Sequence, residues 1–352
     1  MPFEETVRNV WNEGQAADPA GALRALLGLL SLPYRAAVAI RNGLYDRGVL
    51  RQERLPCPVI SVGNLTVGGT GKTPTVVLIA ALLRDKGRRP AVLSRGYGGT
   101  SRAPVNTVSD GTGILMGWRE AGDEPLLIAG ALPDIPVLTG PERVRTGRAA
   151  IERHGADTLI LDDAFQHRAL YRDLDIVLLD GLRPFGNGFL LPRGPLREPP
   201  EAIGRAHLVI RTGNPEPAAP LTGTPSLPSF CGVHRPQEVA KAATGRTIPL
   251  AALRGKKVCA FAGIGRPEMF RRSLEELGAT VVGFRAFSDH HPYRPTDLEA
   301  LRQLAGRSGA ELLITTEKDG VRLADFPAFR ADLSLLRIAM ELTPADGFAE
   351  LL

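Results

Sequence analysis

The sequence predicts an α/β protein whose larger lobe is built around a mostly parallel sheet, with a second, smaller α/β lobe and an N-terminal amphipathic helix. Short apolar runs that end in glycine or acidic residues alternate with longer helical patterns, which is typical of βα units. The prediction rests on two other observations, a glycine-rich loop that follows the first apolar run and a leucine stripe near the N-terminus. The strand-like runs of the larger lobe are Val59–Val62, Ala91–Leu93, Thr158–Leu161 and Ile176–Leu179.

The length of 352 residues favours two lobes over one. Proline, glycine and threonine crowd together between Thr212 and Ser229, which is typical of a crossing between domains. We therefore predict a helical segment over residues 1–50, a larger lobe over 51–228 and a C-terminal α/β lobe over 229–352, with a cleft between the lobes. In the C-terminal lobe we expect strands at Lys257–Phe261, Leu312–Thr315 and Leu336–Ala339 and a helix at Pro267–Leu277.

Composition limits the class of protein and of partner. Apolar residues make up 43% and charged residues 23%, so a packed core is expected. The net charge of +5 favours an anionic partner, such as a nucleotide, a phospholipid or a nucleic acid, without choosing among them. The three cysteines, Cys57, Cys231 and Cys259, are few and far apart, which argues against a disulfide framework and fits a reducing cytosol.

The leucine stripe predicts an amphipathic helix near the N-terminus. Its members recur at helical spacing and are Leu23, Leu26, Leu27, Leu30 and Tyr34. We expect Pro33 to disturb this helix, and the apolar stretch Ala25–Tyr34 is about half as long as a membrane span must be, so no span is predicted. Arginines surround the stripe, so two interpretations remain: a helix docked on the protein's own core, or one lying in the interface of an anionic membrane.

The glycine-rich loop after Val59–Val62 predicts a phosphate site. Glycines let successive backbone N–H groups point into one concavity, the lysine reaches the terminal phosphates, and the threonine hydroxyl ligates Mg²⁺. Pro74 and an apolar helix follow, which places the phosphates at a helix N-terminus. Although a threonine replaces the usual first glycine, this context indicates a P-loop NTPase-type lobe. The predicted nucleotide-binding residues are Thr66, Val67, Gly68, Gly69, Thr70, Gly71, Lys72 and Thr73.

A pair of acids at the end of another strand-like run supports this prediction. Asp162 and Asp163 follow an apolar run, as in a Walker B strand, where a carboxylate holds Mg²⁺. Adjacent side chains on a strand point to different sides, so one acid is expected to serve the metal while the other faces elsewhere. With Thr73, they form the predicted metal site. A merely polar strand end is the alternative.

Two nucleotide-dependent classes lack their signatures. The guanine-recognition pattern fails at Thr316–Asp319, where lysine and aspartate stand side by side. Partner-switching ATPases carry an extra lysine where this chain has Val67. Phosphoryl transfer to a small or lipidic acceptor remains, and it needs a base, a metal site and charge neutralisation.

Acids and histidines at three places are candidates for these roles. Gly122–Pro125 holds two acids between glycine and proline, and His167 follows the Walker B pair. Ser288–His291 carries an aspartate and two histidines, and a histidine that orients an aspartate makes the aspartate an effective base. A zinc site is not expected, because no further His or Cys lies at zinc spacing. Pro192–Pro199 presents two arginines, either as a phosphate clamp or as a surface turn.

These motifs together resemble the tetraacyldisaccharide 4'-kinases of lipid A biosynthesis. The resemblance covers nearly the whole chain in the family's order, through GNLTVGGTGKTP, SRGYGG, GDEP, LDDAFQH, LPRGPLREP, FSDHH and TTEKD. It implies an ATP- and Mg²⁺-dependent kinase that phosphorylates the 4'-hydroxyl of tetraacyldisaccharide 1-phosphate to give lipid IVA. It also implies a peripheral enzyme at the cytoplasmic face of the bacterial inner membrane, with residues 1–50 associating with that membrane. No nucleic-acid or protein partner is expected.

The resemblance also assigns roles to single residues. It implies that Asp123 is the catalytic base with His290 as its partner, and that Lys72, Asp162 and Asp163 take part in catalysis. The implied substrate-binding residues are Glu124, His167, Arg197, Arg95 and Tyr97. A base and a histidine from different lobes would place the reaction in the cleft between them.

Two departures from the family pattern and two competing functions remain. Ala164 stands where the family usually has glycine, which puts the geometry around His167 in doubt if the backbone needs a positive φ there. Gly320 stands where alanine is common. The competing functions are a nucleotide-gated membrane-binding module without transfer chemistry and a soluble small-metabolite kinase.

Overall fold

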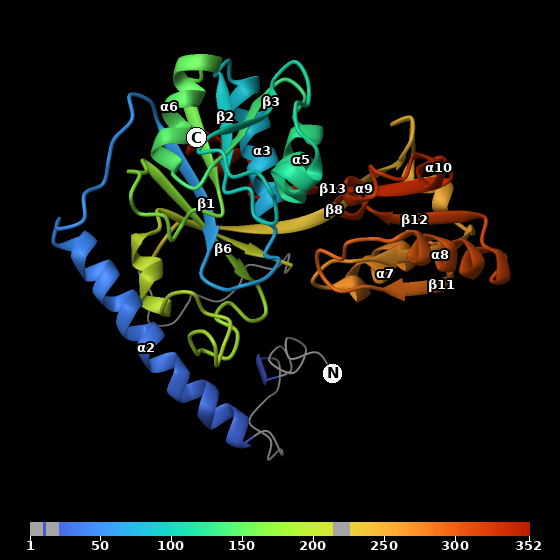
Figure 1. The fold of residues 1–352 in the computed structure, drawn as a ribbon, viewed down its shortest axis with the longest axis horizontal. Coiled ribbons are helices and arrows are strands. Elements are labelled where there is room, and N and C mark those ends of the chain that lie inside the picture. Colours follow the sequence, from blue (N-terminus) through green and yellow to red (C-terminus); the bar gives the residue numbers. More distant parts are fainter. Residues whose placement is uncertain (1–9, 12–20, 214–225) are drawn as a thin grey trace. The chain divides into compact units, whose positions relative to one another are not determined.

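The structure is a computed structural model that describes residues 10–11, 21–213 and 226–352. The chain forms two compact units (Figure 1). Unit 1 combines Met1–Arg95, Gly140–Val233 and Glu341–Leu352, and unit 2 combines Gly96–Thr139 and His234–Met340. This division differs from the predicted one, because residues 96–139 join the C-terminal part and residues 1–50 belong to unit 1. Most of the predicted crossing Thr212–Ser229 lies outside the described residues.

Unit 1 holds a parallel sheet in the order β8-β7-β6-β1-β5-β2. Every residue of its central strand is buried, which explains why most of the run Val59–Val62 is apolar and why apolar and polar residues do not alternate in it. The register places Val62 of the central strand opposite Asp162 of its neighbour, so the two strand ends that carry the predicted motifs lie side by side. The strands are β1 (Val59–Asn64), β2 (Pro90–Ser94), β5 (Thr158–Asp162), β6 (Leu174–Asp180), β7 (Leu208–Thr212) and β8 (Ser229–Lys241).

Helices and one core cluster complete unit 1. The helix α3 (Lys72–Asp85) packs on β1, β2 and β5, and α6 (Arg143–His154) packs on β2. A buried apolar cluster that includes Leu65, Phe165 and Leu196 lies beside the loop after β1. The remaining elements are the 3₁₀ helix η1 (Pro200–Arg205) and α11 (Ala345–Glu350).

Unit 2 has its own parallel strands in the order β11-β10-β12-β13, and it includes the part of β8 from His234 onward. These strands are β10 (Lys257–Ala262), β11 (Thr280–Ala286), β12 (Leu312–Thr316) and β13 (Leu333–Thr343), with β9 (Thr247–Ile248) antiparallel to β8. The helices are η2 (Leu250–Leu253), α7 (Pro267–Glu276), α8 (Pro295–Arg307), α9 (Glu317–Arg322) and α10 (Pro327–Arg330). The predicted strands and the predicted helix of the second lobe are therefore present, with small shifts of their ends.

Residues 96–139 contribute an antiparallel pair and two helices to unit 2. The pair is β3 (Asn106–Asp110) with β4 (Pro136–Thr139), and the helices are α4 (Trp118–Ala121) and α5 (Asp123–Ala131). The helix α5 packs against α9 of the C-terminal part. This packing groups the segment with unit 2, and sequence order alone does not reveal it.

The N-terminal helix α2 spans Gly21–Asp46 and is longer than the sequence suggests. It continues through Pro33. Proline has no N–H to donate to the carbonyl of Leu29, but both residues are exposed, so water can donate to that carbonyl instead. Among the residues that the structure describes, α2 is the one helix whose length and composition would allow it to cross a membrane. The prediction that no segment is long enough to cross a membrane is therefore wrong as regards the length of this helix.

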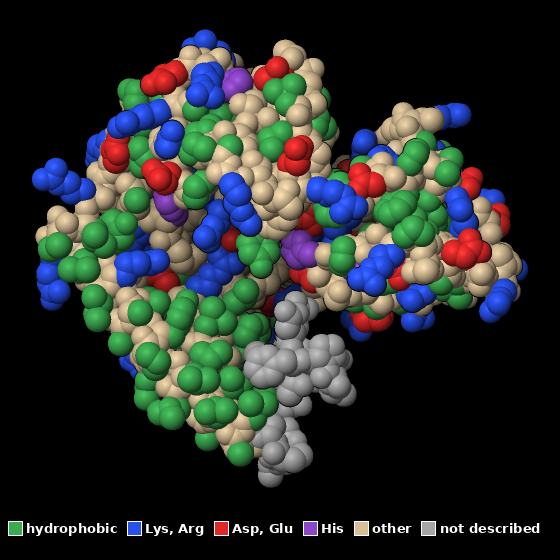
Figure 2. All heavy atoms as spheres, viewed as in Figure 1, with side chains coloured by type: hydrophobic (Ala, Val, Ile, Leu, Met, Phe, Trp, Pro, Cys, Tyr) green, Lys and Arg blue, Asp and Glu red, His purple; other side chains and the backbone are tan. Residues whose placement is uncertain are grey.

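One face of α2 is held on unit 1 by hydrogen bonds as well as by apolar contacts. Leu27 and Val38 are buried, and Ser31 donates to the carbonyl of Leu190 at 3.1 Å. The Tyr34 hydroxyl donates to the carbonyl of Arg197 at 2.9 Å. The predicted stripe is therefore divided, because Leu26 and Leu30 are exposed with the outer leucines. Figure 2 shows hydrophobic side chains gathered over this helix.

Candidate active site

The loop that follows β1 is built as a phosphate site. Gly68 (φ 119°) and Gly71 (φ 88°) have left-handed backbone angles that side-chain-bearing residues rarely adopt. Gly71 is the N-cap of α3, so Lys72 begins the helix and the free N–H groups of its first turn face the loop. The Asn64 side chain donates to the Thr70 hydroxyl at 3.0 Å and ties the two ends of the loop together.

The threonine that opens the loop has a structural explanation. Thr66 forms an isolated antiparallel bridge with Leu196, and the backbone N–H of Val67 donates to the carbonyl of Pro195 at 2.8 Å. The backbone is extended at this point, so glycine's freedom is not required. The bridge also joins the loop to the predicted arginine segment Pro192–Pro199.

Asp163, Lys72 and Arg197 form an ionic cluster beside the loop. The Lys72 Nζ lies 3.7 Å from Asp163 Oδ1, and Arg197 Nη1 donates to both carboxylate oxygens, at 2.8 and 3.0 Å. Burial raises the pKa of Asp163, but the charges of Lys72 and Arg197 outweigh it, so the pKa lies below its ordinary value. The carboxylate thus stays ionised. Asp163 has a φ of 48°, uncommon outside glycine and typical of functional positions.

Asp162 is buried at the end of β5 and lies near a cation that the sequence does not reveal. The Ser94 hydroxyl donates to its Oδ2 at 3.3 Å. Arg143 of α6 is buried too and donates to the carbonyl of Gly140 at 2.6 Å. Burial lowers the pKa of Arg143 to about 10, against the opposing charges of Asp162 and Asp163. Arg143 therefore remains a cation at neutral pH and balances the two acids.

His167 lies after the acid pair and is held neutral. Burial, and then the positive charges of Arg143, Arg172 and other arginines, lower its pKa to about 4. Its Nε2 atom is buried and has no hydrogen-bond partner among the described residues. A neutral imidazole with an unpaired nitrogen is free to accept or donate one hydrogen bond to a ligand.

The structure resolves the question raised by Ala164. Ala164 is fully buried, and the positive φ belongs to the preceding residue, Asp163. The added methyl therefore causes no backbone strain. A methyl on Gly320 would lie 2.7 Å from the side-chain ends of Leu335, so alanine at that position needs a small shift of one leucine.

The second group of predicted residues lies in unit 2, around Asp123 and His290. Asp123 is buried at the first position of α5, after Gly122, whose φ of 92° suits glycine and whose Cα faces the carbonyl of Tyr97 too closely for a side chain. His290 Nδ1 lies 2.9 Å from Asp123 Oδ2. His290 has a φ of 57°, and its N–H donates to Asp289 Oδ1 at 3.0 Å. The predicted pair is therefore in direct contact.

Two cations of α9 surround this pair. Lys318 Nζ lies 3.1 Å from His290 Nε2, and Arg322 Nε lies 3.7 Å from Asp123 Oδ2. Burial raises the pKa of Asp123, but the hydrogen bond from His290 and the charges of Lys318 and Arg322 outweigh it, so the pKa lies below its ordinary value. The carboxylate is thus kept ionised, the form in which it can accept a hydrogen bond or a proton.

Arg322 is itself anchored by Asp319. This buried carboxylate accepts hydrogen bonds from Arg322 (2.6 Å), Tyr293 (2.7 Å) and Thr316 (2.6 Å). Burial, and then the negative charge of Asp319 and its hydrogen bond, raise the pKa of the Tyr293 hydroxyl. This network was not predicted from the sequence. Its only signal is the failed guanine pattern at Thr316–Asp319, where an acid stands directly behind a lysine.

The remaining predicted residues divide between the units. Tyr97 packs edge-on against His290, with ring centroids 6.2 Å apart, and Glu124 Oε1 lies 3.5 Å from Lys318 Nζ, so both join the unit 2 group. Arg95 directly follows β2 in unit 1 and is exposed. Asp123 was expected in the same lobe as the phosphate loop, and this expectation differs from the structure, which places it in unit 2 with His290.

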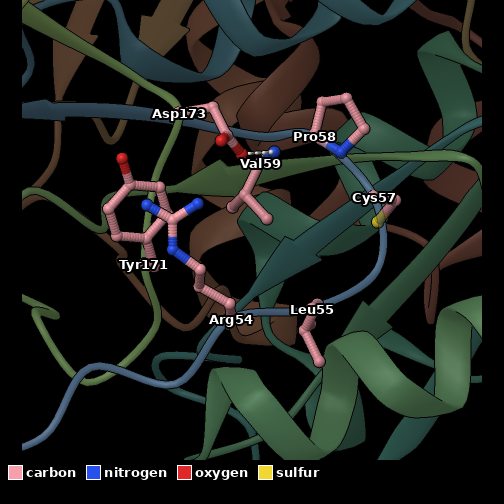
Figure 3. Close-up of a pocket in the computed structure, with 7 residues that line it drawn as sticks. All are labelled: Arg54, Leu55, Cys57, Pro58, Val59, Tyr171 and Asp173. Carbon is pink, nitrogen blue, oxygen red and sulfur yellow. Dashed lines mark hydrogen bonds between the residues drawn. The ribbon is translucent and has the colours of Figure 1, made fainter.

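A cavity of about 260 Å³ lies at the other end of β1 from the phosphate loop and contains none of the predicted residues (Figure 3). Arg54 stacks over the ring of Tyr171 at 3.5 Å, and Asp173 accepts the N–H of Val59 at 2.9 Å. These contacts hold the start of β1 in place, so the residues that line the cavity have a structural role.

Comparisons of sequence and of fold with known proteins point to one family. A family model described as Tetraacyldisaccharide-1-P 4'-kinase matches residues 23–352. A tetraacyldisaccharide 4'-kinase of Syntrophus aciditrophicus is 51% identical over 100% of this chain and 98% of its own length. That of Anaeromyxobacter dehalogenans (strain 2CP-C) is 48% identical over 92% of this chain and 88% of its own. The crystal structure of LpxK from Aquifex aeolicus in complex with ATP is similar, with a TM-score of 0.79 and 35% identity over 94% of this chain and 98% of that one.

Proposed function

Because the chain belongs to the tetraacyldisaccharide-1-P 4'-kinase family, we propose that it transfers the γ-phosphoryl group of ATP to the 4'-hydroxyl of tetraacyldisaccharide 1-phosphate, giving lipid IVA. The observation that carries this proposal is the 2.9 Å contact between Asp123 and His290. A nucleotide-gated binding module has no need of a carboxylate base oriented by a histidine, whereas transfer to an alcohol does.

Unit 1 would bind the donor. The phosphates of ATP would lie against the loop Thr66–Thr73 and the first turn of α3, with Lys72 at the terminal phosphates. Lys72 and Arg197 now share Asp163 as counter-ion, so a triphosphate would compete with Asp163 for the two cations. The structural relative from Aquifex aeolicus, whose crystals contain ATP, supports this assignment.

Magnesium would be held by oxygen ligands near the same loop. Among residues 10–11, 21–213 and 226–352, no three His, Cys, Asp and Glu side chains cluster closely enough to hold a metal ion. The donor set that fits is the Thr73 hydroxyl with Asp162 and Asp163, completed by phosphate oxygens, which is how Mg²⁺ is usually bound. When bound, the ion would neutralise charge on the phosphates. Arg143, a buried cation near both acids, would oppose tight binding without phosphate.

Unit 2 would supply the base. Asp123 would take the proton of the 4'-hydroxyl while the hydroxyl oxygen forms a bond to the γ-phosphorus. The bond between that phosphorus and the leaving ADP oxygen would break. His290 would hold the carboxylate in place through its Nδ1–H, and Arg322 would keep it ionised. Glu124 and Tyr97 would be the substrate contacts supplied by unit 2, and Arg95, His167 and Arg197 would be those supplied by unit 1.

Radiolabelled ATP provides the direct test of the proposal. The purified chain is incubated with ATP labelled at the γ-position, Mg²⁺ and tetraacyldisaccharide 1-phosphate in mixed micelles. Label is expected in the lipid, and Lys72→Met should abolish it because the terminal phosphates lose their cation. ATP-dependent binding to vesicles without labelled lipid would instead support a binding module. Equal transfer to water-soluble sugars would support a small-metabolite kinase.

The exposed face of α2 would hold the enzyme on the cytoplasmic surface of the inner membrane. Its docked face is committed to unit 1 through Ser31, Tyr34 and Asn42, which is difficult to reconcile with a helix surrounded by lipid. Its outer face carries exposed leucines with arginines beside them, as in helices that lie in an anionic interface. We therefore favour peripheral attachment over a span.

Replacing Leu29 and Leu32 by aspartate is expected to weaken binding to anionic vesicles by tenfold or more. These side chains are 64% and 58% exposed, and each buried leucine contributes roughly 1.5–3 kcal/mol. Co-sedimentation measures the effect. Met269→Asp, at an exposed apolar residue of α7 in unit 2, is the matched control and should bind as the parent does. Unchanged binding of the double variant would contradict the assignment.

A further inference from the structure

The contacts of His290 define which of its two ring nitrogens carries a proton. Nδ1 lies 2.9 Å from Asp123 Oδ2, and Nε2 lies 3.1 Å from Lys318 Nζ. The other acid near Nε2, Asp289, lies at 3.8 Å, which is too long for a hydrogen bond. Nε2 therefore has one hydrogen-bonding partner among the described residues, and that partner is an ammonium group.

An ammonium group has three donors and no acceptor. Lys318 donates to Nε2 only if Nε2 carries a lone pair, so the imidazole must be neutral and its proton must sit on Nδ1. Nδ1–H then donates to Asp123. We propose that Lys318 is a positioning residue that fixes His290 as the neutral Nδ1–H tautomer.

Lys318 is well placed for this role because its own position is restricted. It follows the first residue of α9, whose N-cap Thr316 accepts the N–H of Asp319. Its Nζ lies 3.5 Å from Glu124 Oε1 and 3.5 Å from Asp289 Oδ1. Two carboxylates and one ring nitrogen thus share the three donors of one side chain.

The tautomer has a consequence for the reaction, and this part rests on the proposed function. The single lone pair of a neutral Nδ1–H imidazole is at Nε2, where Lys318 occupies it. His290 is therefore not available as the base, and the proton of the acceptor hydroxyl goes to the carboxylate of Asp123. His290 keeps its Nδ1 proton throughout and orients the carboxylate. After transfer, Asp123 returns the proton to solvent.

Nitrogen NMR of the full chain labelled with ¹⁵N-histidine tests the proposal without any assay of activity. At about pH 8, above the ordinary histidine range, the signal of His290, assigned by its loss in His290→Gln, should show a protonated Nδ1 and an unprotonated Nε2. Lys318→Met should shift this signal toward the doubly protonated imidazolium, because Nε2 is then free to bind a proton while Nδ1–H stays on the Asp123 carboxylate, and Lys318→Arg should preserve the parent pattern. A parent signal with Nε2 protonated, or one unaffected by Lys318→Met, would overturn the assignment.

Kinetics separate the structural half of the proposal from the catalytic half. Lys318→Met should lower kcat by about 10- to 100-fold, as loss of an orienting partner typically does, with KM for ATP unchanged, and Lys318→Arg should restore most of kcat. Lys256→Met, at an exposed lysine paired with Glu311, is the matched control. A shift of the His290 signal with unchanged kcat would overturn the catalytic half, while absence of turnover in every form, the parent included, would count against the proposed function alone.

Discussion

Asp123→Asn is expected to lower kcat by about 10²- to 10⁴-fold, the usual contribution of a general base. The substitution keeps the size of the side chain and removes its ability to accept a proton. ATP binding should be unchanged, because the phosphate loop lies in unit 1 and Asp123 lies in unit 2. Turnover is followed by transfer of label to lipid, and ATP binding is followed by calorimetry.

Two further variants define this expectation. Glu276→Gln, at an exposed carboxylate of α7, is the matched control and should retain full kcat. His290→Gln should cost less than Asp123→Asn, because it removes the orienting group and leaves the base. If Asp123→Asn keeps more than about a tenth of the parent kcat, where a base contributes at least 10²-fold, Asp123 is not the base.

The lowered pKa of Asp123 predicts the direction of the pH response. A base is active when deprotonated, and the His290 hydrogen bond with the charges of Lys318 and Arg322 overcomes the effect of burial on this carboxyl. Protonation of Asp123 should therefore reduce kcat only below its ordinary pKa of about 3.9. In Arg322→Met, loss of this activity on acidification should move to higher pH.

Arg322→Met is expected to lower the free energy of unfolding by about 3–5 kcal/mol, the usual cost of removing one partner of a buried ion pair. Arg322 is 2% exposed and its partner Asp319 is 0% exposed, with 2.6 Å between Arg322 Nη2 and Asp319 Oδ1. The substitution leaves the Asp319 carboxylate buried without its cation. Urea unfolding followed by the fluorescence of Trp118, which lies in unit 2, measures the change.

The comparison variant for this measurement is Lys256→Met. Lys256 pairs with Glu311 at 2.6 Å, but both side chains are about half exposed, so the expected cost is about 0–1 kcal/mol. The two variants each remove one cation of a short ion pair in unit 2 and differ in burial. Equal costs would show that Asp319 finds water or another donor when Arg322 is lost.

The parts of the site that depend on local sequence could be predicted from it. The phosphate loop, the Walker B pair and the Asp123–His290 partnership each rest on short motifs, and the last of these came from the family resemblance. Arg143 and Arg322 could not be found in this way. Each stands in an ordinary helical pattern, and its function depends on burial beside an acid, which only tertiary packing reveals.

The fold shows the same division between local and distant information. Buried parallel strands are visible as apolar runs, so the sheets were predictable. The membership of residues 96–139 in unit 2 depends on the packing of α5 against α9, far apart in the chain. The full length of α2 could not be predicted, because Pro33 is expected to disturb a helix, whereas an exposed proline costs the helix one replaceable hydrogen bond.

The docked face of α2 carries a mechanical consequence for catalysis. Tyr34 donates to the carbonyl of Arg197, and Asn42 donates to the side chain of Glu198 at 2.6 Å. The Arg197 side chain in turn donates a hydrogen bond to Asp163, which also pairs with Lys72. A movement of α2 relative to the rest of unit 1 would therefore displace Arg197 and, through it, Asp163. Asp163 is the carboxylate that would compete with a bound nucleotide for Lys72. The helix proposed to lie on the membrane and the loop proposed to bind phosphate are therefore connected through Arg197 and Asp163.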